Sequence, residues 1–129
     1  MAGAVTRRRT ASGGNRPVSG ADDRNLVGEV RSGFGISRRL LGRLTGYSER
    51  AIAGWEAGRS LSEPSRQRMR EMRRLQTALS RVIEPSVLPA WLERPNEEFG
   101  GFKPVEVIER GEVDRLWRMI SELESGVPT

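Results

Sequence analysis

Apolar side chains recur along the chain every three or four residues, which is the spacing of one face of an α-helix. The pattern predicts helices over about residues 24–32, 38–45, 49–57, 63–82, 89–93, 104–109 and 111–125. No run of alternating apolar and polar residues predicts a strand. We therefore expect an all-α protein, with a bundle of helices followed by a smaller helical module.

Two of these helices carry clear apolar stripes. The stripe of the long helix is Met69, Met72, Leu75, Leu79 and Val82, and the arginines predicted to lie mostly on its other faces are Arg66, Arg70, Arg73, Arg74 and Arg81. The stripe of the terminal helix, which is expected to face the core, is Val113, Leu116, Trp117, Ile120 and Leu123. The arginine-rich face is either a solvated surface or part of a surface that meets DNA.

The polar residues at the helix ends predict where two helices begin. Asp22 or Asp23 is expected to cap the first helix, because a carboxylate oxygen accepts a free N–H of the first turn. Gly111 is expected to open the terminal helix, with Glu112 and Asp114 near the positive end of its dipole. The long helix and its exit are also a candidate seam for a homodimer.

Residues 37–58 predict two short helices joined by a tight turn. Ser37 and Ser48 stand where N-caps are wanted, and Gly46 follows the first helix where a left-handed residue is needed. Gly42 has no side chain to keep the two backbones apart. Such a unit is a helix-turn-helix, whose second helix can enter the DNA major groove. The alternative is an ordinary antiparallel helix pair in a small bundle.

The distribution of charge separates the chain into two parts. Residues 1–82 carry 17 Arg and 7 acidic residues, a net charge of +10, whereas residues 83–129 carry 5 basic and 10 acidic residues, a net charge of −5. A basic part suits a polyanion such as DNA, and an acidic part does not. The charge split therefore indicates two different tasks on one chain.

Composition argues against catalysis. The chain has no cysteine and no histidine, which removes thiol nucleophiles, histidine bases and nearly every transition-metal site. The carboxylate pairs Glu97/Glu98 and Glu106/Glu109 could do acid–base work, but no phosphate-binding loop or other catalytic group accompanies them. We therefore expect no enzyme, cofactor or metal. No apolar run approaches the roughly 20 residues of a membrane span, and we expect a cytoplasmic protein.

Residues 37–58 resemble the helix-turn-helix of the Xre (Cro/C1-type) family. The shared pattern is Ser-x3-Leu-Gly-x3-Gly-x-Ser-x3-Ile-x2-Trp-Glu-x-Gly, and its ending, Trp55-Glu56-Ala57-Gly58, is the most specific part. A second segment, residues 87–127, resembles the toxin-binding domain of Xre/MbcA/ParS-type antitoxins. There the order is Trp-Leu, Pro-Asn, Gly-Gly-x-x-Pro, a short apolar helix, a glycine, and a final amphipathic helix that ends at Gly126.

The first resemblance implies that the second helix of the pair is a recognition helix. The outward positions expected to meet base edges are Ser48, Glu49, Arg50 and Ala53. Arg50 could pair with guanine, and Glu49 could accept from cytosine. The expected phosphate contacts are Arg38, Arg39, Arg43 and Arg59. Two positions depart from the family pattern: Arg38 replaces a common glutamine, and Gly54 replaces a long polar side chain.

The second resemblance implies a partner, a RES-domain toxin that consumes NAD. The family's C-terminal module covers the mouth of the toxin's active site. On this chain the expected contacts are Lys103, Arg118, Glu122, Glu124, Ser125, Gly126, Val127, Pro128 and Thr129. An acidic cover suits a site whose basic residues hold a dinucleotide, although any single carboxylate could equally serve to solvate the helix.

The composition of the first residues and the two resemblances together predict three segments. These are a disordered basic tail over 1–24, a helix-turn-helix domain over 25–83 and a toxin-binding domain over 84–129. They imply an antitoxin that neutralises a RES-type toxin and represses its own operon through double-stranded DNA. The alternatives are a stand-alone Xre-family regulator without a toxin partner, and an antitoxin that has lost useful DNA binding.

Overall fold

The computed structural model describes residues 20–126, and these residues form helices and turns without strands. The helices are α1 Gly20–Phe34, α2 Arg38–Thr45, α3 Glu49–Glu56, α4 Glu63–Val82, α5 Leu88–Leu92, α6 Pro104–Glu109 and α7 Asp114–Ser125, with a 3-10 turn, η1, at Glu97–Phe99. The predicted all-α fold is confirmed. None of the described helices is both long and apolar enough to cross a membrane.

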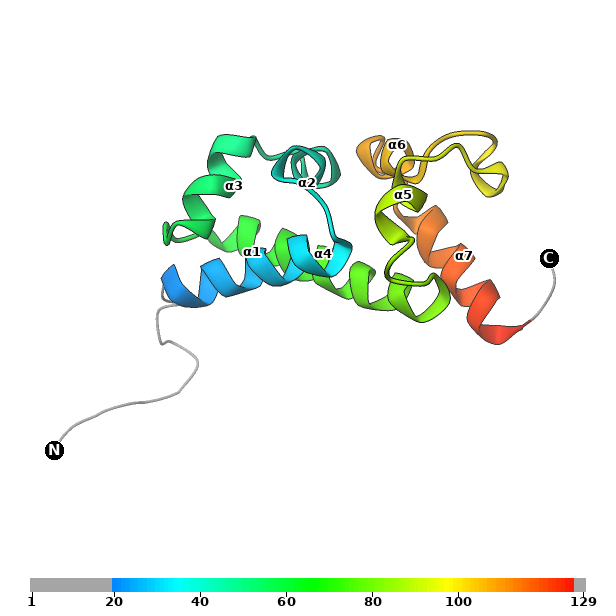
Figure 1. Cartoon of the computed structure of the whole chain (residues 1–129), viewed down its shortest axis with the longest axis horizontal. Helices are drawn as coiled ribbons and strands as arrows, with labels where there is room; N and C mark the ends of the chain where they lie inside the picture. The colour runs from blue at the N-terminus through cyan, green and yellow to red at the C-terminus, as the bar shows by residue number, and fades with distance from the viewer. Residues whose placement is uncertain (1–19, 127–129) are drawn as a thin grey trace, which may run out of the picture.

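Helix α4 runs along the length of the molecule, and the other helices are arranged around it (Figure 1). Helix α1 packs on α4 and on α3, and α7 packs on α4 farther toward its C-terminal end. Helix α2 contacts both α3 and α6, so it lies between the N-terminal and C-terminal parts of the chain. The two parts therefore meet where α4 packs on α7 and where α2 packs on α6.

One continuous apolar core joins these contacts. It includes Phe34 of α1, Leu41 of α2, Leu75 of α4 and Leu116 of α7, all with no exposed surface. The proposed boundary between residues 83 and 84 stays a prediction, but the core crosses it. A chain cut there would lose apolar cover from α4 and expose surface that is buried in the whole protein.

A buried ion pair holds α1 to the first turn of α4. Both carboxylate oxygens of Asp23 accept from the guanidinium of Arg66, at 2.9 and 3.2 Å, and one also accepts from the backbone N–H of Leu61 at 2.8 Å. Arg66 donates in addition to the Leu61 carbonyl at 2.8 Å and to Glu63 at 2.7 Å. The hydrogen bonds from Arg66 outweigh burial and lower the pKa of the Asp23 carboxyl.

This pair corrects three predictions. Asp23 does not cap α1, because the helix begins at Gly20 and Asp23 lies inside it with no exposed surface. Arg66 does not lie on a solvent face of α4, since Asp23 draws its guanidinium into the interior. Residues 20–24 are helical and so do not belong to the predicted disordered tail, whose remainder, with Arg7, Arg8, Arg9 and Arg16, falls outside the described residues.

The terminal helix also differs from its prediction. Gly111 has a left-handed φ of +79° and closes α6 by donating to the Ile108 carbonyl, so α7 begins three residues later, at Asp114. Leu116, Met119 and Ile120 of α7 are buried, whereas Trp117 is 38% exposed and Leu123 is 56% exposed. Periodicity identifies which residues share a face of a helix, but the neighbouring helices decide how much of that face is covered.

We predict that Asp23→Asn destabilises the protein by about 3 kcal/mol at neutral pH, because it leaves the buried guanidinium of Arg66 poorly compensated. The pKa of Asp23 is lowered by folding, so its contribution is complete above the unfolded-state pKa of about 4 and is lost as the pH falls through the lower folded-state value. Urea unfolding of the wild type and of Asp23→Asn, at about pH 7 and pH 3, measures the difference in their free energies of unfolding. That difference should be smaller at the lower pH.

The matched control is Glu29→Gln, which removes the exposed pair between Glu29 and Arg73. That substitution should change the free energy of unfolding by less than about 1 kcal/mol. The stabilising role of the Asp23–Arg66 pair would be contradicted if Asp23→Asn lowered the free energy of unfolding no more than the control does. It would also be contradicted if the loss were the same at both pH values.

Candidate nucleic-acid and partner interfaces

Three local features build the pair formed by α2 and α3. The hydroxyl of Ser37 accepts from the N–H of Leu40 at 3.1 Å, and that of Ser48 accepts from the N–H of Ala51 at 3.0 Å. Gly46 ends α2 in a left-handed conformation, with φ at +85°, and donates to the Gly42 carbonyl at 2.7 Å. The predicted caps and the predicted glycine turn are confirmed.

Gly42 allows the turn after α2 to approach that helix. A Cβ atom added to Gly42 would lie 2.7 Å from the carbonyl oxygen of Tyr47, which is much closer than such atoms pack. The Tyr47 ring in turn meets Trp55 of α3 edge to face, with ring centroids 5.0 Å apart. Gly42 thus sets how closely the turn, and α3 after it, can approach α2.

Glu56 ties the pair to α1. Its carboxylate accepts from Arg31 of α1 at 2.7 Å and from Arg38 of α2, and its side chain is only 11% exposed. Burial raises the pKa of the Glu56 carboxyl, but the hydrogen bonds and charges of the two arginines outweigh burial and hold the pKa below its ordinary value. This contact gives a physical reason for the glutamate of the Trp-Glu-x-Gly ending.

The predicted base-reading positions lie together at the start of α3. Ser48, Glu49 and Arg50 are exposed and Ala53 is half-buried. Ser48 uses its hydroxyl oxygen in the cap, so its remaining hydrogen is what it could offer to a base. Arg50 makes no ion pair with any residue in the described part of the chain.

The four predicted phosphate contacts have different environments. Arg39 is exposed, and within residues 20–126 it has no carboxylate partner. Arg38 is held by Glu56, and Arg43 makes two hydrogen bonds of 2.8 Å to the carboxylate of Glu109 on α6. Those bonds lower the pKa of the Glu109 carboxyl. Arg43 therefore has a structural role, linking α2 to α6, that its position in the sequence did not indicate.

Arg59 explains the glycine that departs from the family pattern. Its guanidinium carbon lies 3.4 Å from the place that a Cβ on Gly54 would occupy, and its backbone N–H donates to the Gly54 carbonyl at 2.9 Å. The absence of a long side chain at residue 54 leaves room for Arg59 to lie against α3. A positive charge from the exit loop is thereby placed beside the candidate recognition helix.

The structure spreads the predicted toxin contacts over two regions. Lys103 lies in the loop before α6, where its N–H donates to the Glu106 carboxylate at 2.7 Å. Arg118, Glu122, Glu124 and Ser125 lie on α7, which ends at Gly126 in a left-handed conformation, and Glu124 pairs with Arg81 of α4 at 2.7 Å. Val127, Pro128 and Thr129 fall outside the described residues.

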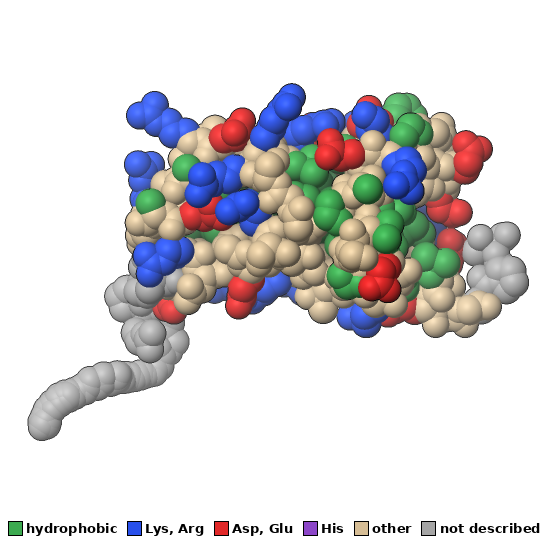
Figure 2. Space-filling model, viewed as in Figure 1, with side chains coloured by type: hydrophobic (Ala, Val, Ile, Leu, Met, Phe, Trp, Pro, Cys, Tyr) green, Lys and Arg blue, Asp and Glu red, His purple; other side chains and the backbone are tan. Residues whose placement is uncertain are grey.

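Charged side chains are distributed unevenly on the surface. On the face shown in Figure 2, lysine and arginine side chains gather over the part that contains α2 and α3. Apolar side chains are exposed on the other part of that face, toward the C-terminal helices. Across residues 20–126 no group of three or more acidic side chains could hold a metal ion.

An all-α fold of this kind occurs in a known complex. A chain in the crystal structure of the M. tuberculosis MbcT–MbcA toxin–antitoxin complex has the same fold, with a TM-score of 0.68 over 82% of this chain and 96% of that one, at 24% identity. The chain is also similar in sequence to the mycobacterial cidal antitoxin MbcA of Mycobacterium tuberculosis and Mycobacterium bovis. The identity is 27% over 111 residues, which are 85% of this chain and 90% of MbcA. No family model matches the chain.

We predict that Gly42→Ala destabilises the protein by about 2 kcal/mol, because the new methyl group meets a backbone carbonyl that no side-chain rotation can move. Urea unfolding measures the loss. The control is Gly28→Ala in α1, where an added Cβ meets nothing within 4 Å and the helix propensity of alanine should leave stability equal or higher. Equal stability of the two variants would contradict the close crossing of α2 and α3.

Proposed function

We propose that the chain is the antitoxin of a type II toxin–antitoxin pair, and that it does not act as an enzyme. In this proposal it binds a RES-type, NAD-degrading toxin, covers its active site, and represses its own operon as a dimer or together with the toxin. The observation that carries the proposal is the similarity to MbcA, which extends over 85% of this chain and 90% of MbcA.

The geometry of α2 and α3 supports DNA binding. Arg39 and Arg50 are exposed, and neither has a carboxylate partner among residues 20–126. Arg50 stands in the first turn of α3, where a recognition helix presents side chains to base edges. In this proposal Arg50 reads a base, Arg39 and Arg59 contact phosphates, and α2 with α3 acts as the helix-turn-helix.

The C-terminal part of the chain supports contact with a toxin. Residues 83–129 carry the net charge of −5, and α7 presents Glu122 and Arg118 beside its exposed end. An acidic surface is attracted to a site that binds a dinucleotide through basic residues. In this proposal the end of α7 covers that site, and no bond in the toxin is broken or formed.

We expect the full chain to neutralise the RES-type toxin encoded beside it by forming a stoichiometric complex. Purified toxin, NAD and increasing amounts of the chain would be mixed, and the rate of NAD loss measured. The rate should fall in proportion to the added chain and reach zero at a fixed ratio. Full neutralisation at a much lower ratio of chain to toxin would indicate that the chain acts catalytically. If the folded chain does not neutralise the toxin, a stand-alone regulator becomes the better hypothesis.

For DNA, we predict that Arg50→Ala weakens binding to the chain's own promoter by about tenfold and relaxes the preference for that sequence over unrelated DNA. Arg39→Ala should weaken binding to the promoter and to unrelated DNA by the same factor. It should also reduce the slope of log affinity against log salt concentration by about one. Fluorescence anisotropy at several salt concentrations measures both effects. Arg94→Ala, in the C-terminal part, is the control, and an Arg50→Ala variant that binds like wild type at every salt would refute the assignment of α3.

A further inference from the structure

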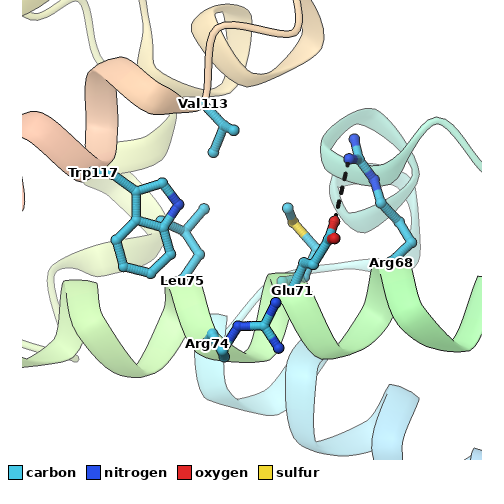
Figure 3. A pocket seen from close by; sticks show the side chains of 7 residues that line it. Arg68, Glu71, Arg74, Leu75, Val113 and Trp117 are labelled. Atoms are coloured by element: carbon cyan, nitrogen blue, oxygen red, sulfur yellow. Dashed lines mark ion pairs between the residues drawn. The ribbon is translucent and has the colours of Figure 1, made fainter.

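A tryptophan stands at the surface where α7 meets α4. Leu116, Met119 and Ile120 fill the core beneath α7, while Trp117 stays 38% exposed. Figure 3 shows its indole on one side of a pocket between the two helices, opposite Glu71 and Arg68 of α4. The pocket has a volume of about 380 Å³, and its apolar lining is Trp117 and Val113, with the buried side chains of Leu75 and Met72 at its floor.

A second hollow adjoins the first along α4. It has a volume of about 360 Å³ and is lined by Thr77 and Ala78 together with arginines. Trp117 and Arg74 line both hollows, and we call the two neighbouring hollows together the Trp117 groove. An indole exposed in such a groove is apolar surface that remains in contact with water in the isolated chain.

Several arginines line the groove, and one of them has no carboxylate partner among the described residues. Arg73 and Arg81 line the groove, and each pairs with an exposed carboxylate, Arg73 with Glu29 at 2.8 Å and Arg81 with Glu124 at 2.7 Å. Arg74 is exposed and has no ion pair within the part of the chain that the structure describes. The groove thus combines an apolar indole with a guanidinium that has no ion pair among residues 20–126.

We propose that the Trp117 groove is a docking surface for an acidic segment of the partner toxin. An apolar side chain of that segment packs on Trp117 over Leu75, and a neighbouring carboxylate accepts two hydrogen bonds from Arg74. Tryptophan and arginine are the residues that most often dominate the energy of protein interfaces. The inference rests on the proposed function, and it adds a contact on α4 to the end of α7 that is proposed to cover the active site.

The charges of the groove favour a protein segment over DNA. Glu71 lies inside the first pocket, and Glu29 and Glu124 stand beside the arginines of the second. These carboxylates would repel a continuous phosphate backbone, whereas a protein segment can place one carboxylate at Arg74 and an apolar side chain on the indole. A phosphate backbone also offers nothing apolar to cover Trp117.

The experiment measures the affinity of the full chain for the purified RES-type toxin by titration calorimetry. Trp117→Ala should weaken the complex by about thirtyfold, the size expected when an interface tryptophan is truncated. Arg74→Gln should weaken it several-fold, and Arg74→Glu should weaken it further, because the reversed charge repels an acidic segment. Arg24→Glu on α1, an equal change of charge at an exposed arginine outside the groove, should leave the affinity within about twofold.

Thermal unfolding of each variant separates loss of contact from loss of fold. Arg74 is exposed and has no ion pair with another described residue, so its substitutions should leave the unfolding midpoint unchanged and provide a test that does not depend on the core. If the wild-type chain binds the toxin and the groove variants bind equally well, the groove inference is wrong and the proposed function stands. If the wild-type chain does not bind the toxin, both are wrong.

Two further outcomes would also overturn the inference. Tighter binding by Arg74→Glu would mean that the segment in the groove is basic. Loss of promoter binding by Arg74→Glu, with toxin affinity unchanged, would place the groove in the DNA interface.

Discussion

Helix α4 is covered by two other helices of the same chain, α1 and α7. The arrangement of the remaining helices depends on these two contacts. Its 20 residues extend for roughly 30 Å, longer than any of the helices that pack on it. Helix α1 and α7 both pack on α4, and the buried Asp23–Arg66 pair sets the register of its first turn against α1. Because the core is continuous along α4, the N-terminal and C-terminal parts are stabilised together.

The second meeting point, between α2 and α6, has a different physical character. Arg43 and Glu109 are each 35% exposed on their side chains, so their ion pair is screened by water and contributes modestly to stability. The pair mainly orients the two helices, because two hydrogen bonds between a guanidinium and a carboxylate fix direction as well as distance. Helix α2 packs against α3, so this pair also orients the helix that we propose as the DNA-recognition element.

The same fold leaves one large apolar side chain only partly covered. Trp117 belongs to a stripe that predicts burial, yet α4 covers the side of α7 that carries Leu116 and Ile120 and leaves the indole at the edge. An exposed indole at the edge of the core lowers the solubility of the isolated protein. A partner that covers the indole would remove this exposed apolar surface. The proposed docking groove is therefore a consequence of how far α7 lies across α4.

The sequence by itself determined which segments are helical, the serine caps of α2 and α3, and the turn between those two helices. The bounds of α2 and α6 follow from it, because serine hydroxyls, prolines and a left-handed glycine act on their own neighbours. Only the tertiary structure decided the ion pairs Asp23–Arg66, Arg38–Glu56 and Arg43–Glu109, because the two members of each pair lie between 18 and 66 positions apart. It decided equally that Trp117 and Leu123 stay exposed. The periodicity of a helix shows which residues share a face. Whether that face is buried depends on segments distant in the sequence, whose positions a local pattern does not give.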